Sequence, residues 1–163
     1  MIDEFVEACA KKGVVLDTNL LLLTFVGTHD RSLISRFKRT AKYAPEEFDA
    51  IIRLLTLFRV RATTPHVLTE VVDLASQLHE PVRERLLTEI RTYFGPLEER
   101  FARARDLAMD AAFPQIGLAD SSVAQLCAEG FGLVTDDFPL ANRLARRGMR
   151  VLNFNTIRPM LWE

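Results

Sequence analysis

The apolar run GVVL at residues 13–16 ends directly in an acid, Asp17. The run does not alternate with polar residues, which is typical of a strand covered on both faces of a parallel sheet. A helical pattern follows at once over residues 19–26. An Asp placed directly after a buried strand needs a partner, because burying an unpaired carboxylate is costly. This stretch therefore predicts a parallel α/β fold with a polar site at the end of its first strand.

The rest of the chain alternates between helical and strand patterns. We expect helices over 2–12, 32–42, 45–57, 65–79, 81–93, 97–111, from Asp120 to 129, and over 138–147. We expect further strands at 58–64, 132–135 and 149–154, a loop from Gly27, and irregular structure over 111–117. This alternation predicts a three-layer α/β/α sandwich with a central parallel sheet of four or five strands. From a length of 163 residues we expect a single domain, 1–163, with residues 28–58 as a helical insertion or arm.

Cysteine use and hydropathy predict a location. The two cysteines, Cys9 and Cys127, form no CxxC motif and suggest no disulfide framework. The first residues place acids before lysines without an apolar segment, unlike a secretory signal. No apolar run approaches the roughly 20 residues that cross a bilayer. We therefore expect a cytoplasmic protein with no membrane partner.

The charges balance overall but are segregated along the chain. Lys and Arg number 21 against 22 Asp and Glu, yet residues 106–142 contain no Lys or Arg. Basic residues concentrate over 31–61 and 143–150. Solvated helix faces would explain any one basic run. The whole pattern favours an acidic centre with a basic surround, which suits a polyanion whose phosphates meet bound cations.

Carboxylates stand where the strands are expected to end. Asp17 follows the first strand, and Asp136 and Asp137 follow the strand 132–135. Asp120 begins the helix before that strand, and Glu70 lies at the apolar edge of the helix after the strand 58–64. Taken singly, these acids could be helix caps or solvated residues. Parallel sheets bind ligands at the carboxyl ends of their strands, and gathered carboxylates repel one another unless a cation such as Mg²⁺ or Mn²⁺ lies between them.

Four motifs together resemble the PIN domain family, the nuclease fold shared by VapC-type toxins and several RNA-processing enzymes. They are VVLDTNLLL, TTPHVLTEVV, GLADSSVAQLCAEG and GLVTDDFPLA. The resemblance implies that Asp17, Glu70, Asp120 and Asp137 are the catalytic and metal-binding acids, with Asp136 as the adjacent alternative to Asp137. It places Asn19 in a small polar position and Thr135 in a supporting hydroxyl position. The chain departs from the family in its longer segment 28–58 and in showing no recognisable edge strand over 81–116.

The function implied by this resemblance is that of an endoribonuclease. One or two Mg²⁺ or Mn²⁺ ions would bind the four acids, and a metal-activated water would cleave RNA to leave 5′-phosphate and 3′-hydroxyl ends. As the toxin of a toxin–antitoxin pair, the protein would also bind an antitoxin. The alternative is a catalytically inactive PIN-like module that binds RNA or a protein.

Phosphotransfer domains with an aspartyl nucleophile are competing interpretations, since Asp17 ends a strand. Dehalogenase-like enzymes would require a second Asp where Asn19 stands. Receiver domains would require an acidic pair at a strand end and a late Lys. Here Asp3 and Glu4 precede a helical pattern, and no Lys follows Lys42. Both interpretations fit less well than the nuclease.

The basic arm carries a separate hypothesis. Arg36 and Arg39 belong to the segment 28–58 and are expected on its exposed surface. We expect them to grip the RNA backbone beside the acids. The rival hypothesis makes the arm a surface for a homodimer or an antitoxin.

Overall fold

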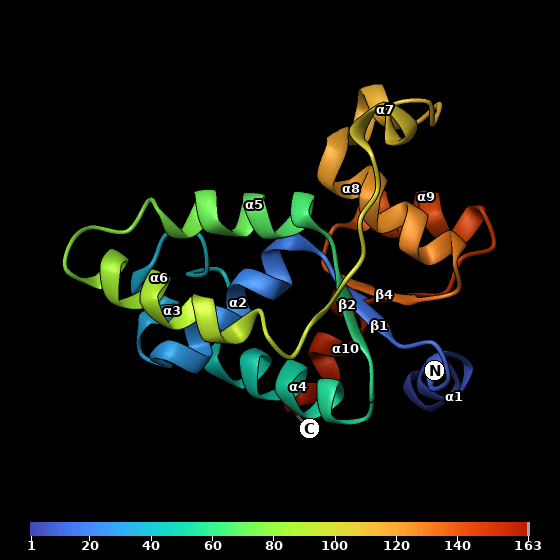
Figure 1. The fold of residues 1–163 in the computed structure, drawn as a ribbon. Helices are drawn as coiled ribbons and strands as arrows, with labels where there is room; N and C mark the ends of the chain where they lie inside the picture. The colour runs from blue at the N-terminus through green and yellow to red at the C-terminus, as the bar shows by residue number, and fades with distance from the viewer. Residues whose placement is uncertain (163) are drawn as a thin grey trace.

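One parallel sheet organises the molecule (Figure 1). The computed structural model describes the backbone of residues 1–162 and the side chains of residues 1–160. Five strands lie in the order β3-β2-β1-β4-β5, and every neighbouring pair is parallel. The strands are β1 (Val14–Leu16), β2 (Arg61–Thr63), β3 (Glu98–Glu99), β4 (Gly132–Thr135) and β5 (Val151–Asn153). In register, Val15 of β1 lies opposite Ala62 on one side and Leu133 on the other.

Helices cover both faces of the sheet, which confirms the predicted three-layer α/β/α class. The helices are α1 (Ile2–Cys9), α2 (Thr18–His29), α3 (Leu33–Arg36), α4 (Pro45–Thr56), α5 (Pro65–Ala75), α6 (Val82–Tyr93), α7 (Ala104–Leu107), α8 (Phe113–Ala128), α9 (Phe138–Arg146) and α10 (Phe154–Ile157), followed by the 3₁₀ helix η1 (Arg158–Trp162). Figure 1 shows α2, α4 and α6 on one side of the sheet and α1, α8 and α9 on the other. None of the helices described is long and apolar enough to span a bilayer.

The strand order locates the point at which ligands bind in folds of this kind. From β1 the chain builds β2 and β3 toward one edge, then returns to add β4 and β5 on the other side of β1. The order therefore reverses between β1 and β4, and open parallel sheets place their ligands outside the carboxyl ends at such a reversal. Asp17 and Asp136 are the residues that directly follow β1 and β4.

Helix α2 is buried on almost all sides. All residues from Leu20 to Gly27 are buried, because α3, α4, α5 and α6 all pack around this helix. A Cβ atom at Gly27 would lie 2.4 Å from the Phe48 ring of α4, so the two helices approach closely at this glycine. The loop expected from Gly27 is therefore wrong: α2 continues to His29, and the glycine permits close packing instead of a turn.

Several other expected boundaries differ from the structure. The helix expected over 32–42 is only the single turn α3, and the helices expected over 2–12 and 65–79 end at Cys9 and Ala75. The helix expected over 97–111 is wrong, because this segment contains the short edge strand β3 and then the single turn α7. Both residues of β3 are exposed glutamates, so no apolar run indicates a strand.

The third acidic motif lies in the second part of a kinked helix, α8. Helix α8 begins at Phe113, within the stretch expected to be irregular. Gly117 interrupts α8 with φ of 76°, a left-handed conformation that glycine adopts without steric cost. Asp120 lies three residues after this kink, at the beginning of the second part of α8.

Candidate active site

Asp17 is buried at the end of β1, with 4% of its surface exposed. It caps α2: its Oδ1 atom accepts a hydrogen bond from the Leu20 backbone N–H at 2.9 Å. Its Oδ2 atom accepts from the Thr135 hydroxyl and from the Asp136 backbone N–H at 3.2 Å. Burial raises the pKa of Asp17 to about 7, against the hydrogen bonds that favour the charged form, and the nearby Asp136 carboxylate adds to the rise. The buried Asp after the first strand thus finds its partners at the end of β4, as the strand order requires.

Asp136 is compensated by two residues of the arm. Its Oδ2 atom accepts from the Lys42 ammonium at 2.7 Å and from the Tyr43 hydroxyl at 2.6 Å. The side chain of Asp136 is only 4% exposed, and its Oδ1 atom is buried with no hydrogen-bond partner among the described residues. Burial and the bond to Asp136 raise the pKa of Tyr43, so this hydroxyl remains protonated and donates. The segment 28–58 therefore supplies a fixed positive charge to the acidic site.

A second group of acids forms around Asp120. Burial raises the pKa of Asp120 to about 6, and the carboxylates of Asp137 and Glu70 add to the rise by like-charge repulsion. Asp137 is exposed and caps α9 by accepting from the Leu140 N–H at 2.8 Å. Glu70 is exposed on α5, and a surface pocket between α5 and α8 has Glu70 in its wall. Two other elements, α5 and the turn after β4, thus bring carboxylates close enough to affect Asp120.

Thr135 joins the two groups of acids. Its hydroxyl donates to Asp17 and accepts from the Asp137 backbone N–H at 3.0 Å. The side chain is fully buried at the end of β4. One hydroxyl therefore fixes the turn 135–137 against the end of β1. The two acids of that turn differ in their surroundings, because Asp136 pairs with Lys42 whereas Asp137 is exposed and acts on Asp120.

A hydroxyl pair fixes α8 against the start of α5. The Ser122 hydroxyl donates to the Ala119 carbonyl at 2.6 Å, so the Thr64 hydroxyl is the donor in the 2.7 Å bond between Thr64 and Ser122. Thr64 also caps α5 by accepting from the Val67 N–H at 3.2 Å. Because Ser122 lies two residues after Asp120, this buried contact holds Asp120 near the first turns of α5, where Glu70 stands.

The segment after β5 contacts the turn that carries Asp136. The Asn155 amide donates to the Asp136 carbonyl at 2.7 Å. Arg158 donates to the Asn155 side-chain oxygen at 2.9 Å and, through its Nε, to the buried Glu47 of α4. The Arg158 guanidinium also lies 5.6 Å from the centre of the Tyr43 ring. These contacts connect α4, the arm and the chain after β5 to the turn that carries Asp136.

Three other residues predicted for the site are exposed. Asn19 lies in the first turn of α2, two residues after Asp17. Arg36 donates to Asp30 at 3.2 Å, and Arg39 donates to Gln77 at 2.7 Å, so their described partners are not the acids of the site. In place of these arginines, the structure brings Lys42 to the acids.

Five residues around the acids are not predicted by the sequence: Lys42, Tyr43, Asn155, Arg158 and Glu47. Lys42 is one cation in a basic run, and the spacing of Tyr43 indicates a core aromatic. Asn155 has a usable signal, because it lies just after the last strand, much as Asp17 follows the first. The contact between Arg158 and Glu47 joins residues 111 positions apart and has no local signal.

The donor set fits a hard divalent cation by its chemistry. The acids offer only oxygen atoms, the ligands that Mg²⁺ and Mn²⁺ prefer. The unpartnered Oδ1 atom of Asp136 and the repulsion felt by Asp120 are both conditions that a cation would relieve. Among the described residues, no three His, Cys, Asp or Glu side chains are already placed around one point as ligands.

Comparisons with known protein families, with curated proteins and with solved structures found no match to this chain. The fold and the site define its class by themselves. It is an α/β protein with a parallel sheet and a cluster of carboxylates where the strand order reverses.

Proposed function

We propose that the protein is a metal-dependent endoribonuclease. The observation that supports this most strongly is that the Thr135 hydroxyl joins the buried Asp17 to the turn carrying Asp137, whose carboxylate acts with that of Glu70 on Asp120. Such a cluster is unfavourable without a counter-charge, and Lys42 neutralises only the Asp136 side of it. The resemblance to PIN domains in the four motifs points to RNA as the substrate.

The residues of the chain have separable roles in this proposal. Glu70, Asp120 and Asp137 would hold one or two Mg²⁺ or Mn²⁺ ions together with Asp17. Bound ions of this kind supply an activated water and neutralise charge on the phosphate. Thr135 orients Asp17 and the turn that carries Asp137. Lys42 and Tyr43 hold Asp136 in place, and the Lys42 ammonium offsets part of its charge.

The first prediction tests the need for metal. Purified protein treated with EDTA should not cleave a single-stranded RNA, and Mg²⁺ or Mn²⁺ should restore cleavage where Zn²⁺ does not, because the donors are all oxygen. A fluorescence-quenched RNA of mixed sequence provides the readout. The matched control is the Asp120→Asn variant, which should remain folded and inactive at every metal concentration. Full cleavage by the chelated wild-type protein in metal-free buffer would contradict the proposal.

The ion pair between Lys42 and Asp136 favours a second candidate. A site whose acid is already compensated by Lys42 and Tyr43 is compatible with an inactive module that binds RNA or a protein. The same assay separates the two functions when RNA binding is followed by fluorescence anisotropy. Binding without cleavage at any concentration of Mg²⁺ or Mn²⁺ would establish the module and exclude the nuclease.

A further inference from the structure

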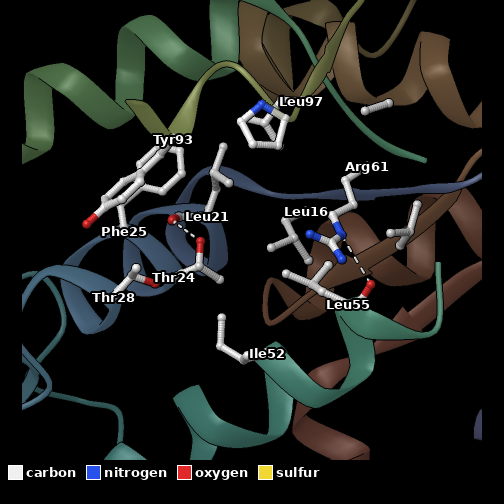
Figure 2. Close-up of a pocket in the computed structure, with 13 residues that line it drawn as sticks. Leu16, Leu21, Thr24, Phe25, Thr28, Ile52, Leu55, Arg61, Tyr93 and Leu97 are labelled. Carbon is white, nitrogen blue, oxygen red and sulfur yellow. Dashed lines mark hydrogen bonds between the residues drawn. The ribbon is translucent and has the colours of Figure 1, made fainter. Parts of the chain in front are cut away.

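A cavity of about 170 Å³ lies on one face of the sheet, away from the acids (Figure 2). Its walls come from β1, β2, α2, α4, the end of α6 and the segment after α6. Most of its lining is apolar, including Leu16, Leu21, Phe25, Ile52, Leu55 and Leu97. An apolar cavity of about 150 Å³ accommodates one benzene molecule, so this cavity has the size for a single ring.

Arg61 places a charge in this apolar wall. It is the first residue of β2 and is partly buried. Figure 2 shows its side chain reaching toward Leu55, where its Nε donates to the Leu55 carbonyl at 3.2 Å. Its two terminal nitrogens donate to no acceptor among the described residues, and no described carboxylate forms an ion pair with it. Arg31 and Arg100, by contrast, both pair with carboxylates.

The two terminal nitrogens of Arg61 have no counter-charge among the described residues, so they are free to pair with an anion that enters the cavity. Sites for small ligands have this composition, with apolar walls and a few polar groups that fix orientation. The guanidinium fork matches a carboxylate through two parallel hydrogen bonds. Thr28 and Pro96 both line the cavity and are exposed, so the cavity opens to solvent beside these two residues.

We propose that this cavity binds a small organic monocarboxylate that carries one ring-sized apolar group. The ring occupies the space between α2 and α4, and the carboxylate pairs with the free nitrogens of Arg61. This site is independent of the acidic site and of the nuclease activity proposed for it. The two sites are nevertheless neighbours along the chain, because Leu16 and Leu21 line the cavity and Asp17 lies between them.

Benzoate is the probe, and benzamide is the neutral molecule of the same shape. In a titration followed by methyl NMR, benzoate should shift the signals of Leu16, Leu21, Leu55 and Leu97 saturably. Benzamide should bind roughly tenfold more weakly, as expected for the loss of one charge-assisted pair. The Arg61→Gln variant should bind benzoate no better than benzamide. The side-chain amide of the glutamine can still donate to the Leu55 carbonyl, so the substitution removes the charge but keeps this hydrogen bond.

Arg59→Gln is the matched control, because Arg59 is exposed two residues earlier and does not line the cavity. It should bind benzoate as the wild type does. Thr28→Phe should weaken both ligands by narrowing the opening. The proposal is overturned if benzoate gives no saturable shifts in the millimolar range, if the shifts map to another surface, or if benzoate and benzamide bind the wild type equally. The last comparison needs no variant, so it remains decisive if Arg61→Gln does not fold.

Discussion

At the scale of single residues, Asp17 combines a structural and a chemical role. Its carboxylate caps α2 by accepting a hydrogen bond from the Leu20 N–H. It also accepts hydrogen bonds from the Thr135 hydroxyl and the Asp136 N–H, which lie at the end of β4. An N-cap alone would serve as well with Ser or Asn. Burying the Asp17 charge therefore lowers the free energy of unfolding, and the need for a helix cap does not account for a charged residue here. The size of this effect depends on pH.

The second prediction follows from this cost. The pKa of Asp17 is raised from 3.8 to about 7, so the native state binds this proton more tightly than the unfolded chain. The contribution of Asp17 to stability is thus fully present below about pH 4, decreases as the pH rises to about 7, and is constant above that. In chelator, Asp17→Asn should remove this decrease, a difference on the order of a few kcal/mol in the free energy of unfolding. Urea unfolding from pH 4 to pH 8 measures it.

The exposed Asp3 of α1 offers a control for that measurement. Asp3→Asn should leave the pH dependence of the wild type unchanged. If the profiles of wild type and Asp17→Asn stay parallel across the whole range, the carboxyl of Asp17 titrates at its ordinary pKa and burial does not shift it.

The third prediction separates the two neighbouring acids of the β4–α9 turn. Asp137→Asn should preserve stability, because Asn caps a helix as well as Asp does. It should lower RNA cleavage by at least roughly 100-fold, more than is typical for residues that only support metal ligands. Asp136→Asn should lower stability by about 1–2 kcal/mol, because Lys42 loses its anionic partner and Tyr43 a charged acceptor. Unfolding and cleavage assays on both variants give the comparison.

The opposite ranking has a clear meaning. If Asp136→Asn abolishes cleavage at unchanged stability while Asp137→Asn remains active, Asp136 is the fourth acid of the site.

The sequence indicates the acids well and their partners poorly. Asp17, Asp136 and Asp137 are predictable because each follows a strand whose apolar run is visible in the sequence. Lys42 and Tyr43 are not, because their place at Asp136 depends on how the chain between α3 and α4 passes the sheet. Local patterns contain no information on such contacts between distant segments.

At the scale of the element, the four apolar strands and most of the long helices follow from hydropathy and from the positions of prolines. Helix α4 lies within one residue of its expected bounds, because Pro45 marks its start and its apolar face is regular. The failures occur where tertiary contacts replace local signals. Gly27 resembles the start of a turn but lies inside α2, and β3 consists of two glutamates held by pairing with β2.

The fourth prediction concerns the contact between α2 and α4. Gly27→Ala should destabilise the protein by about 1–3 kcal/mol, because the new Cβ would lie 2.4 Å from the Phe48 ring and the helices must separate. Phe48→Leu in the same chain should recover part of the loss by freeing space. Thermal or urea unfolding of the single and double variants measures the coupling.

Gly95→Ala is the matched control. A Cβ atom there would have the Thr92 carbonyl oxygen at 3.7 Å as its nearest neighbour, an ordinary contact. It should leave stability nearly unchanged. Equal losses for the two glycine variants would show that the close approach at Gly27 does not limit stability.

At the scale of the whole molecule, the arm and the acids are connected. Lys42 and Tyr43 attach the segment 28–58 to the turn after β4, so the arm has a fixed position beside the site. The two arginines proposed to bind RNA differ in their surroundings. Arg36 is paired with Asp30, whereas Arg39 contacts the neutral Gln77.

The fifth prediction ranks these two arginines. Charge reversal of Arg39 should weaken RNA binding more than charge reversal of Arg36, whose charge is already partly neutralised by Asp30. The slope of log affinity against log salt should fall by roughly 0.7 for each phosphate that the variant no longer neutralises. Anisotropy titrations at several salt concentrations measure both effects, and cleavage of bound RNA should be unchanged. An unaltered slope with a changed mass in light scattering would instead assign the arm to a protein partner.

The position of β1 between β2 and β4 also affects the order in which the strands can pair during synthesis. Asp17 and Thr135 are 118 residues apart in the chain. At a synthesis rate of roughly 5–20 residues per second, Thr135 is therefore added roughly 6–24 s after Asp17. During that interval the nascent chain can pair β1 with β2, but the edge that β4 will occupy stays open. An unpaired apolar edge is a template for association with other chains. Among the five strands, β1 is therefore the one with the longest interval between its own synthesis and that of its second neighbour. Its open edge is the part of the nascent chain that a chaperone would shield for longest.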